Sequence, residues 1–471
     1  MAETVSGERS EERPGAREAA VVAGVPAWRG GFGRLWGAAV VSRFGDALRG
    51  TALPLLAYAL TDSPVLIALV TACGFVPWLL FGLVGGAIAD RVDQRRAMWV
   101  VDVLRGLLMA AFAVALWLDE VGIGLLLALS FALTTFQTVF DNAATALLPS
   151  VVPQAALARA NARLMTGQEV MGRFVGGPVV PLLIALGAAV PFAADAVTYL
   201  VAAVLVASLR VGGRPGGSEP AGSFEGPVAA DDGAGRSGEG EAAAAGAGER
   251  RGSVRARWRE TREGIRALRG EMGEGLRALW GDRVLRVFSV AVALGNVGIG
   301  ALIATLVVLV KGWLGAGDAG YAAVTTGYGV GMVVGGLVAP RVVAVLGGPR
   351  RTLLIAGLVQ CGVLVAFGTV RSAPVAVGLL GVFGFAGMVW NVVETTAVQR
   401  RSPARLLGRI SAAFRTVSTA GAPLGALLGG AVAAAWGPNV PALLAAALIG
   451  GGSLALIPVL GAGRGHQEKA W

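Results

Sequence analysis

Twelve uninterrupted apolar runs restrict this chain to one class of fold. They fall at 35–60, 65–89, 97–118, 121–147, 164–187, 189–209, 287–311, 318–340, 352–370, 373–397, 410–436 and 439–460. An α-helix needs about 20 predominantly apolar residues to cross the hydrocarbon core of a bilayer. Only 15% of the residues are charged, too few to cover a soluble protein of this size. We therefore expect an all-α membrane protein with twelve transmembrane helices.

The placement of Lys and Arg predicts how these helices are oriented. With twelve spans, both termini lie on the same side of the membrane. Apart from five arginines within the spans, every Lys and Arg falls on that side, except Arg371 and Lys311, the last residue of its span. Because cytoplasmic loops are rich in Lys and Arg, we expect a multi-pass protein of the cell membrane with both termini in the cytoplasm. The net charge of +10 is then a topology signal, and no nucleic-acid partner is expected.

Composition divides the chain into six parts. The segment that follows the sixth run begins with a stretch rich in Gly, Ala, Ser, Pro and acids, which is typical of a disordered linker. Apolar residues then recur at helical spacing between arginines, which is typical of an amphipathic helix on a membrane surface. The expected parts are a disordered tail 1–31, a six-helix bundle 32–210, the linker 211–253, the amphipathic helix 254–286, a six-helix bundle 287–461 and a tail 462–471.

An internal repeat relates the two bundles. At an offset of 250 residues, Gly45-Asp46 corresponds to Gly295-Asn296, and the segment 85–91 corresponds to 335–341. This offset holds from the first helix of each half to the start of the fifth. Six spans separate equivalent positions, so both halves have the same orientation. The sequence therefore predicts two pseudo-symmetric six-helix bundles, with a site between them near the midplane.

Several residue types are too rare to support catalytic or metal sites. The only histidine is His466, close to the C-terminus, and the two cysteines, Cys73 and Cys361, lie inside apolar runs. No P-loop and no nucleophile–base motif occurs, so ATP binding of that kind and an enzyme activity are not expected. We expect no metal and no cofactor. The expected partners are a small-molecule substrate, protons and membrane lipid, and the expected oligomeric state is a monomer.

A charged motif follows the second run and carries a family resemblance. The chain reads Gly86-Ala-Ile-Ala-Asp90-Arg91-Val-Asp93-Gln-Arg95-Arg96. This resembles the loop signature of the major facilitator superfamily, which has Gly where this chain has Asp93. The resemblance implies a transporter that works by alternating access. It also implies a conformational latch, here formed by Gly86, Asp90, Arg91, Arg95 and Arg96.

Two further segments are similar to one branch of that superfamily. Residues 42–46 (Ser-Arg-Phe-Gly-Asp) and 406–410 (Leu-Leu-Gly-Arg-Ile) are similar to the branch that contains macrolide and siderophore (enterobactin) exporters. The segment Gly172-Arg-Phe-Val-Gly176-Gly177-Pro178 looks like the Gly-x-x-x-Gly-Pro element of proton-driven exporters. Because proline kinks a helix and glycine removes bulk, Gly177 and Pro178 also predict a structural bend.

Besides Asp318, the first residue of its span, six acids lie within the predicted spans, where each needs a partner, a proton or a cavity. They are Asp46, Asp102, Asp141, Glu169, Asp195 and Glu394. Asp46 lies about 17 Å along the first span at 1.5 Å per residue, near mid-membrane. Asp102, Asp141, Glu169 and Glu394 lie toward the cytoplasmic side, and Asp195 lies near the outer end.

Helical spacing pairs some of these acids with arginines. Arg43 and Asp46 are one turn apart, as are Glu169 and Arg173, and these four residues are the candidates for proton coupling or substrate contact. Asp102 and Arg105 form a third pair, for which a structural role is expected. A charged cytoplasmic gate is expected from Asp141, Glu394 and Arg415, which lie near the inner ends of their helices.

These features predict a proton-coupled exporter of a bulky hydrophobic or amphipathic compound, such as a drug, a macrolide-like antibiotic or a siderophore. Ala, Val, Leu and Gly dominate the spans, and Asn, Gln and Tyr are few, which favours apolar cargo because polar substrates need placed polar groups. Uptake of a sugar or other nutrient by the same fold is the main alternative. A membrane-embedded enzyme and a non-transporting sensor are further alternatives.

Overall fold

The protein is helical throughout the part of the chain that its structure, a computed structural model, describes. That part comprises residues 31–77, 93–152, 156–209, 270, 273–403 and 406–461, and it contains no β-strand. Nine helices in these ranges are long and apolar enough to cross a membrane, and a bent helix pair forms a tenth crossing if it is one span. The expected all-α membrane fold is therefore confirmed.

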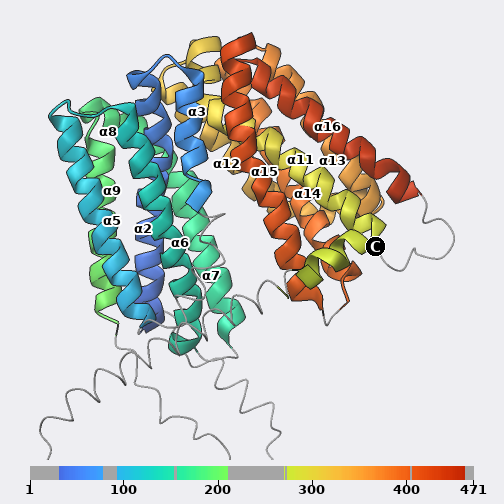
Figure 1. The fold of residues 1–471 in the computed structure, drawn as a ribbon, viewed down its shortest axis with the longest axis horizontal. Helices are drawn as coiled ribbons and strands as arrows, with labels where there is room; N and C mark the ends of the chain where they lie inside the picture. The colour runs from blue at the N-terminus through green and yellow to red at the C-terminus, as the bar shows by residue number, and fades with distance from the viewer. Residues whose placement is uncertain are drawn as a thin grey trace, which may run out of the picture. The chain divides into compact units, whose positions relative to one another are not determined.

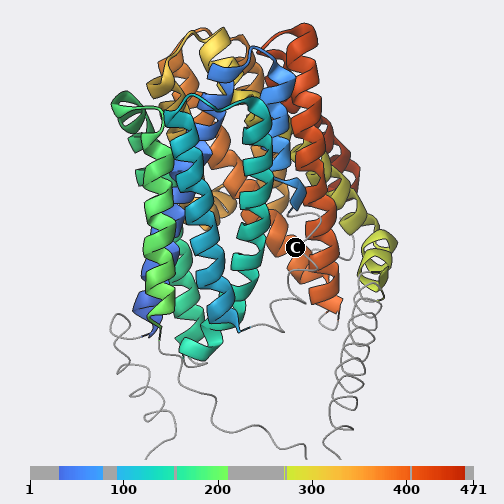
Figure 2. The ribbon, with the colours of Figure 1, turned by 60° about the vertical axis from the view of Figure 1, so that its left-hand side comes forward.

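The first half of the chain supplies six helical segments that coincide with the first six predicted spans (Figures 1 and 2). The fifth is a composite of two α-helices and a π-helical segment, Val170–Gly176. The second predicted span, 65–89, lies partly outside the described ranges. The elements are α2 (Gly31–Leu60), α3 (Pro64–Cys73), α5 (Gln94–Trp117), α6 (Ile123–Val151), α7 (Leu157–Glu169) with α8 (Gly177–Leu186), and α9 (Val190–Ala207).

The second half repeats this order. Its first helix, α11, continues into a π-helical segment, Leu309–Trp313. The elements are α11 (Arg283–Val308), α12 (Asp318–Val345), α13 (Pro349–Thr369), α14 (Ala373–Arg401), α15 (Leu407–Trp436) and α16 (Val440–Gly461). Each overlaps one of the last six predicted spans, so the pattern of apolar runs located the helices of both halves.

Glycine and proline mark helix ends at equivalent positions of the two halves. Gly187 and Gly437 have φ of 151° and 112°, which glycine adopts without strain, and they end α8 and α15. Pro lies in the first turn of α9, at Pro191, and at Pro441 in the equivalent helix α16. Proline is tolerated there because the N–H that it lacks would have no helical acceptor.

The repeat offset predicted from sequence is wrong for the third helix of each half. The residue that precedes α5 is Asp93, and the one that precedes α13 is Gly348, so the offset there is 255 residues rather than 250. The doublets Arg95-Arg96 and Arg350-Arg351 agree with this value. The fourth helices, α6 and α14, begin at Ile123 and Ala373 and restore the offset of 250.

The predicted bend in the fifth span is present. The segments Arg163–Gly172 and Gly177–Leu186 meet at 42°, and the π-helical residues lie between them. A Cβ added at Gly176 would lie 2.5 Å from the Cβ of Ala47 on α2, which is too close for carbon atoms. Gly176 therefore permits the fifth span to approach α2 one residue from Asp46. The neighbours Gly177 and Pro178 start α8.

Within each half, glycines allow helices to touch through their backbones, as small residues do in membrane bundles. An added Cβ at Gly327, Gly331 or Gly335 of α12 would overlap the carbonyl groups of Val377, Gly381 and Phe385 on α14. Gly421, Gly425 and Gly429 of α15 approach the backbone of α11 in the same way. The close packing that their spacing predicts is therefore observed.

This packing predicts that Gly331→Ala destabilises the protein. Ala normally stabilises a helix by roughly 1 kcal/mol relative to Gly, but here its methyl group would overlap Gly381. Overpacking of this kind costs about 1–3 kcal/mol, so the melting temperature of the solubilised protein should fall. Gly362→Ala on α13 is the matched control, because a Cβ at that position meets nothing within 4 Å. Equal melting temperatures for the two variants would contradict the packing argument.

The chain forms two compact units. The first contains both helical halves apart from the start of α15, and the second comprises residues 212–282 and 402–414. In the described part of the second unit, residues 273–281 are helical, and Glu274 forms an ion pair with Arg409. These residues belong to the predicted amphipathic helix 254–286, whose remaining part before residue 273, apart from residue 270, lies outside the described ranges. The linker 211–253 and both predicted tails, apart from Gly31, also lie outside them.

Candidate functional site

A buried cluster of charged residues occupies the interior of the first half. It forms where α2, α5, α6 and α9 lie side by side (Figures 1 and 2). The side chains of Asp102, Arg105 and Asp195 are 0% exposed. We name the whole group the charge cluster, and its members are Asp46, Arg49, Asp102, Arg105, Gln137, Asp195 and Tyr199.

Arg105 is the centre of the charge cluster. It donates to Asp46 Oδ1 at 2.8 Å, to the Tyr199 hydroxyl at 2.6 Å and to Asp102 Oδ1 at 3.3 Å. It also donates to the side-chain oxygen of Gln137. The predicted pair of Asp102 and Arg105 is therefore present. Both side chains are buried.

Asp46 accepts hydrogen bonds from three elements of the first half. Arg49 of α2 donates at 2.9 Å, Arg105 of α5 at 2.8 Å and the Tyr199 hydroxyl of α9 at 2.6 Å. Arg49 rather than Arg43 is thus the ion-pair partner one turn away on α2. The sequence offered an arginine on each side of Asp46 at equal spacing, and only the packing of α9 against α2 selects Arg49.

Asp195 makes only long contacts within the charge cluster. Its Oδ2 lies 3.5 Å from Arg49 Nε, yet neither atom has a hydrogen-bond partner. Its Oδ1 accepts only from Thr198 of its own helix, at 3.4 Å. Asp195 and Tyr199 are four residues apart and share a face of α9. That spacing is the signal in the sequence that would have placed both residues in the site.

A small pocket of about 230 Å³ leads to the charge cluster from the side of α7. Arg43, Asp46 and Glu169 line it, together with Gln168 and Gly172. The structure therefore brings together three of the four residues predicted for coupling. The side chain of the fourth, Arg173, lies outside the described part.

The predicted latch is described only in part. Gly86, Asp90 and Arg91 lie outside the described ranges. Arg95 donates to the carbonyl groups of Val206 and Ala207 at the end of α9. A positive charge there interacts favourably with the negative end of the helix dipole. Asp93, the departure from the family signature, accepts from the backbone N–H of Arg96 at 3.1 Å and so caps α5.

The three predicted gate residues have different surroundings. Asp141 accepts a hydrogen bond from Gln137 at 2.8 Å, which joins it to the charge cluster. Glu394 is 6% exposed and accepts from the indole N–H of Trp390 at 3.2 Å. Arg415 is an exposed residue of α15. The gate itself stays a prediction.

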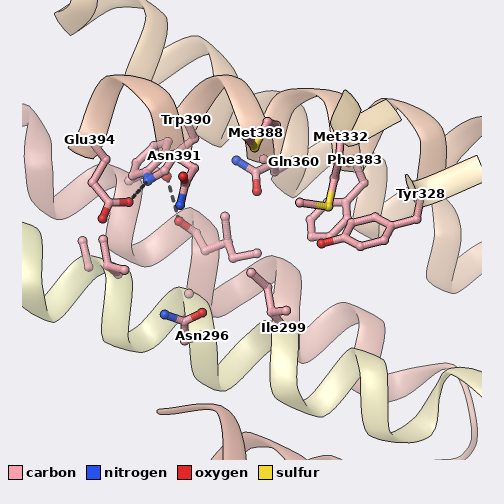
Figure 3. Close-up of a pocket in the computed structure, with 17 residues that line it drawn as sticks. Asn296, Ile299, Tyr328, Met332, Gln360, Phe383, Met388, Trp390, Asn391 and Glu394 are labelled. Carbon is pink, nitrogen blue, oxygen red and sulfur yellow. Dashed lines mark hydrogen bonds between the residues drawn. The ribbon is translucent and has the colours of Figure 1, made fainter. Parts of the chain in front are cut away.

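A cavity of about 250 Å³ lies in the second half, among α11, α12, α13, α14 and α16. Figure 3 shows Glu394, Trp390 and Asn391 at one end of it, and Tyr328 and Phe383 at the other. Glu394 was predicted as a gate residue, whereas the other residues were not predicted, because no charge or motif marks them. The polar lining between the two ends includes Asn296 and Gln360.

The repeat relates this cavity to the charge cluster. With the offset corrected for the third helix, residues in the cavity lining are equivalent to members of the charge cluster or to their neighbour Asp141. In each case the second half has a neutral residue: Asn296 stands for Asp46, Gln360 for Arg105, Asn391 for Asp141, and Ile449 for Tyr199. At these positions the first half therefore has mainly charged side chains that pair with one another, and the second half has neutral side chains, three of them amides, that line a cavity.

No arrangement typical of a metal centre occurs in the described ranges, where no three His, Cys, Asp or Glu side chains gather around one point. The acids of the charge cluster are arranged around arginines instead.

Comparisons with known proteins agree with the fold. A family model described as the Major Facilitator Superfamily matches residues 35–426. The crystal structure of the nucleoside transporter NupG superposes with a TM-score of 0.66 at 10% identity, covering 91% of this chain and 99% of that one. A bacterial homologue of the human lysosomal transporter Spinster, inward-facing and occupied, gives 0.59 at 15% identity, covering 91% and 94%. No curated protein matches the sequence.

Proposed function

The chain belongs to the major facilitator superfamily, and on that premise we propose that it is a proton-coupled exporter of an amphipathic organic compound. The family and the transporter structures it resembles indicate a transporter rather than an enzyme. The observation that carries the proposal of proton coupling is the composition of the charge cluster. Because the charge cluster lies in the first half and the 250 Å³ cavity lies in the second, the proton would have a binding site separate from that cavity.

The charge cluster contains one more acid than base. Asp46, Asp102 and Asp195 form ion pairs with Arg49 and Arg105. Arg43 and Asp141, which lie beside Asp46 and Gln137 at the edge of the cluster, add one charge of each sign. An unpaired charge in a membrane helix costs about 2.5–3.5 kcal/mol on insertion scales, and one bound proton removes it. The unsatisfied Asp195 Oδ2 and Asp102 Oδ2 are the oxygens free to receive that proton. The pocket at Asp46 gives a proton a route toward them.

Binding and release of this proton would change how the helices of the first half hold together. Arg49 lies between Asp46 on its own helix and Asp195 on α9. Protonation of Asp195 leaves Arg49 to Asp46 alone and weakens the contact between α2 and α9. Such a change needs to differ between two conformations by only a few kcal/mol to shift their populations strongly.

The direction of transport is proposed from the sequence. Residues 42–46 and 406–410 are similar to the macrolide and siderophore exporters, and we place the protein in the cell membrane with both termini in the cytoplasm. Uptake of a polar compound is the second candidate. The three amide side chains in the cavity favour it, because they can hydrogen-bond to a polar solute.

Transport by intact cells tests both candidates. Cells that express the protein should accumulate less of an exported amphipathic compound than cells with the empty vector. Because the proposed coupling uses the proton gradient, a proton uncoupler should remove that difference. Higher accumulation in the expressing cells would favour uptake instead, and an effect that survives the uncoupler would contradict proton coupling.

A further inference from the structure

Glu394 is a buried acid that faces a cavity without a basic partner. The residue is 6% exposed, and it accepts a hydrogen bond from the indole N–H of Trp390, one turn away on α14, at 3.2 Å. No Lys or Arg lines the cavity, and Glu394 forms no ion pair with any described residue of the chain. A buried carboxylate needs a compensating charge, so the site is incomplete without a cation or a proton.

The cavity lining has the groups that bind organic cations. Trp390 lies beside Glu394, and Tyr328 and Phe383 line the far end (Figure 3); aromatic faces attract ammonium groups, Trp most strongly. Met332 and Met388 add adaptable apolar surface. A small inorganic cation would require several oxygen ligands around it, whereas this lining is mainly aromatic and apolar.

The cavity also separates a charged end from an apolar end. Glu394 and Phe383 are 11 residues apart on α14, which is about 16 Å at the helical rise of 1.5 Å per residue. At the apolar end, the rings of Tyr328 and Phe383 are stacked with centroids 5.9 Å apart. Figure 3 shows the amide of Gln360 between the two ends, where it can bond to a polar group of a bound molecule.

We propose that this cavity binds an organic cation, with its ammonium group at Glu394 and its apolar body against Tyr328 and Phe383. This inference rests on the proposed function as a transporter and names its class of substrate. A quaternary or protonated amine that carries an aromatic or aliphatic body fits both ends. The cavity volume of about 250 Å³ suits one such arm rather than a complete macrocycle.

Equilibrium dialysis with the purified full-length protein tests the proposal. The probe is 4-phenylbutyltrimethylammonium, and the neutral comparison is 4-phenyl-1-butanol, which has the same ring and linker. Wild-type protein should bind the cation roughly tenfold or more tightly than the alcohol, because only the cation forms a charge-assisted contact. Glu394→Gln should remove that preference while the affinity for the alcohol stays the same.

Asp318→Asn is the matched control, since this acid lies at the start of α12 and forms an ion pair with Lys311 at 2.6 Å, away from the cavity. It should keep the preference of the wild-type protein for the cation. Melting temperatures of all three proteins establish that each is folded. Equal binding of the cation by wild type and Glu394→Gln, or no binding of the cation by folded wild type, would overturn the proposal.

This measurement is independent of transport. Dialysis in detergent involves no proton gradient, so cation binding that depends on Glu394 would stand even if transport were not coupled to protons. Conversely, suppose that export is sensitive to the uncoupler but that the protein does not prefer the cation to the alcohol. The proposed function would then stand, and this inference alone would fail.

Discussion

Replacing Arg105 with Met should destabilise the first half of the protein and abolish transport. Met preserves much of the length of the side chain but removes the donors that hold Asp46, Asp102, Gln137 and Tyr199 together. Two buried acids then lose their shared cation. Breaking a buried ion pair by removing one partner typically costs about 3–5 kcal/mol. We expect a much lower melting temperature for the solubilised variant and little protein in the membrane.

A second substitution separates this electrostatic effect from loss of packing. Asp102→Asn removes one of the stranded charges, so the double variant Arg105→Met/Asp102→Asn should melt at a higher temperature than Arg105→Met alone. Arg341→Met, at an exposed position of α12, is the control and should melt like the wild-type protein. If the double variant melts no higher than the single one, charge balance is not what makes Arg105 important.

Replacing Asp46 with Asn should abolish proton-driven transport in a protein that still folds. In the wild-type protein, Arg49, Arg105 and Tyr199 all donate to Asp46 Oδ1. Asn keeps an oxygen acceptor for these three donors. The charge cluster is then left with two acids and two arginines. Because this set is balanced without a bound proton, the variant should reach the membrane but lose transport that depends on the proton gradient. Uptake of a labelled substrate into proteoliposomes with an imposed gradient measures this directly.

Asp119→Asn controls for the loss of a carboxylate. Asp119 is an exposed residue after α5 with φ of 58°, a conformation that Asn tolerates well. This variant should transport like the wild-type protein. Normal, gradient-dependent transport by Asp46→Asn would show that Asp46 takes no part in coupling, and would direct attention to Asp102 and Asp195 alone.

The sequence by itself determined the class of the fold. Uninterrupted apolar runs long enough to cross a bilayer leave the α-helix as the structure that satisfies every backbone hydrogen bond within one segment. That constraint is local, so it could be read without knowing any tertiary contact. Glycines at intervals of four residues also mark the faces of α12 and α15 that approach another helix closely, because the absence of a side chain is itself a local property.

Local spacing was also sufficient for the pair of Asp102 and Arg105, which share one helix face. It failed for Asp46, where Arg43 and Arg49 are equally distant in sequence. The choice between them depends on Asp195, which is distant in sequence and reaches Arg49 only after α9 packs against α2. An ion-pair partner was thus predictable within a helix where one candidate existed, and not where two did.

The cavity of the second half was decided by tertiary structure alone. Asn296, Gln360 and Asn391 come from three different helices, and each is an ordinary polar residue in its own apolar run. Such residues are few in the predicted spans, and their scarcity favoured an apolar substrate. Helix packing concentrates them in one place, together with Trp390 and the unpaired Glu394. A binding site arises from that concentration, because the free energy of burying polar groups depends on their neighbours in space and not on their neighbours in sequence.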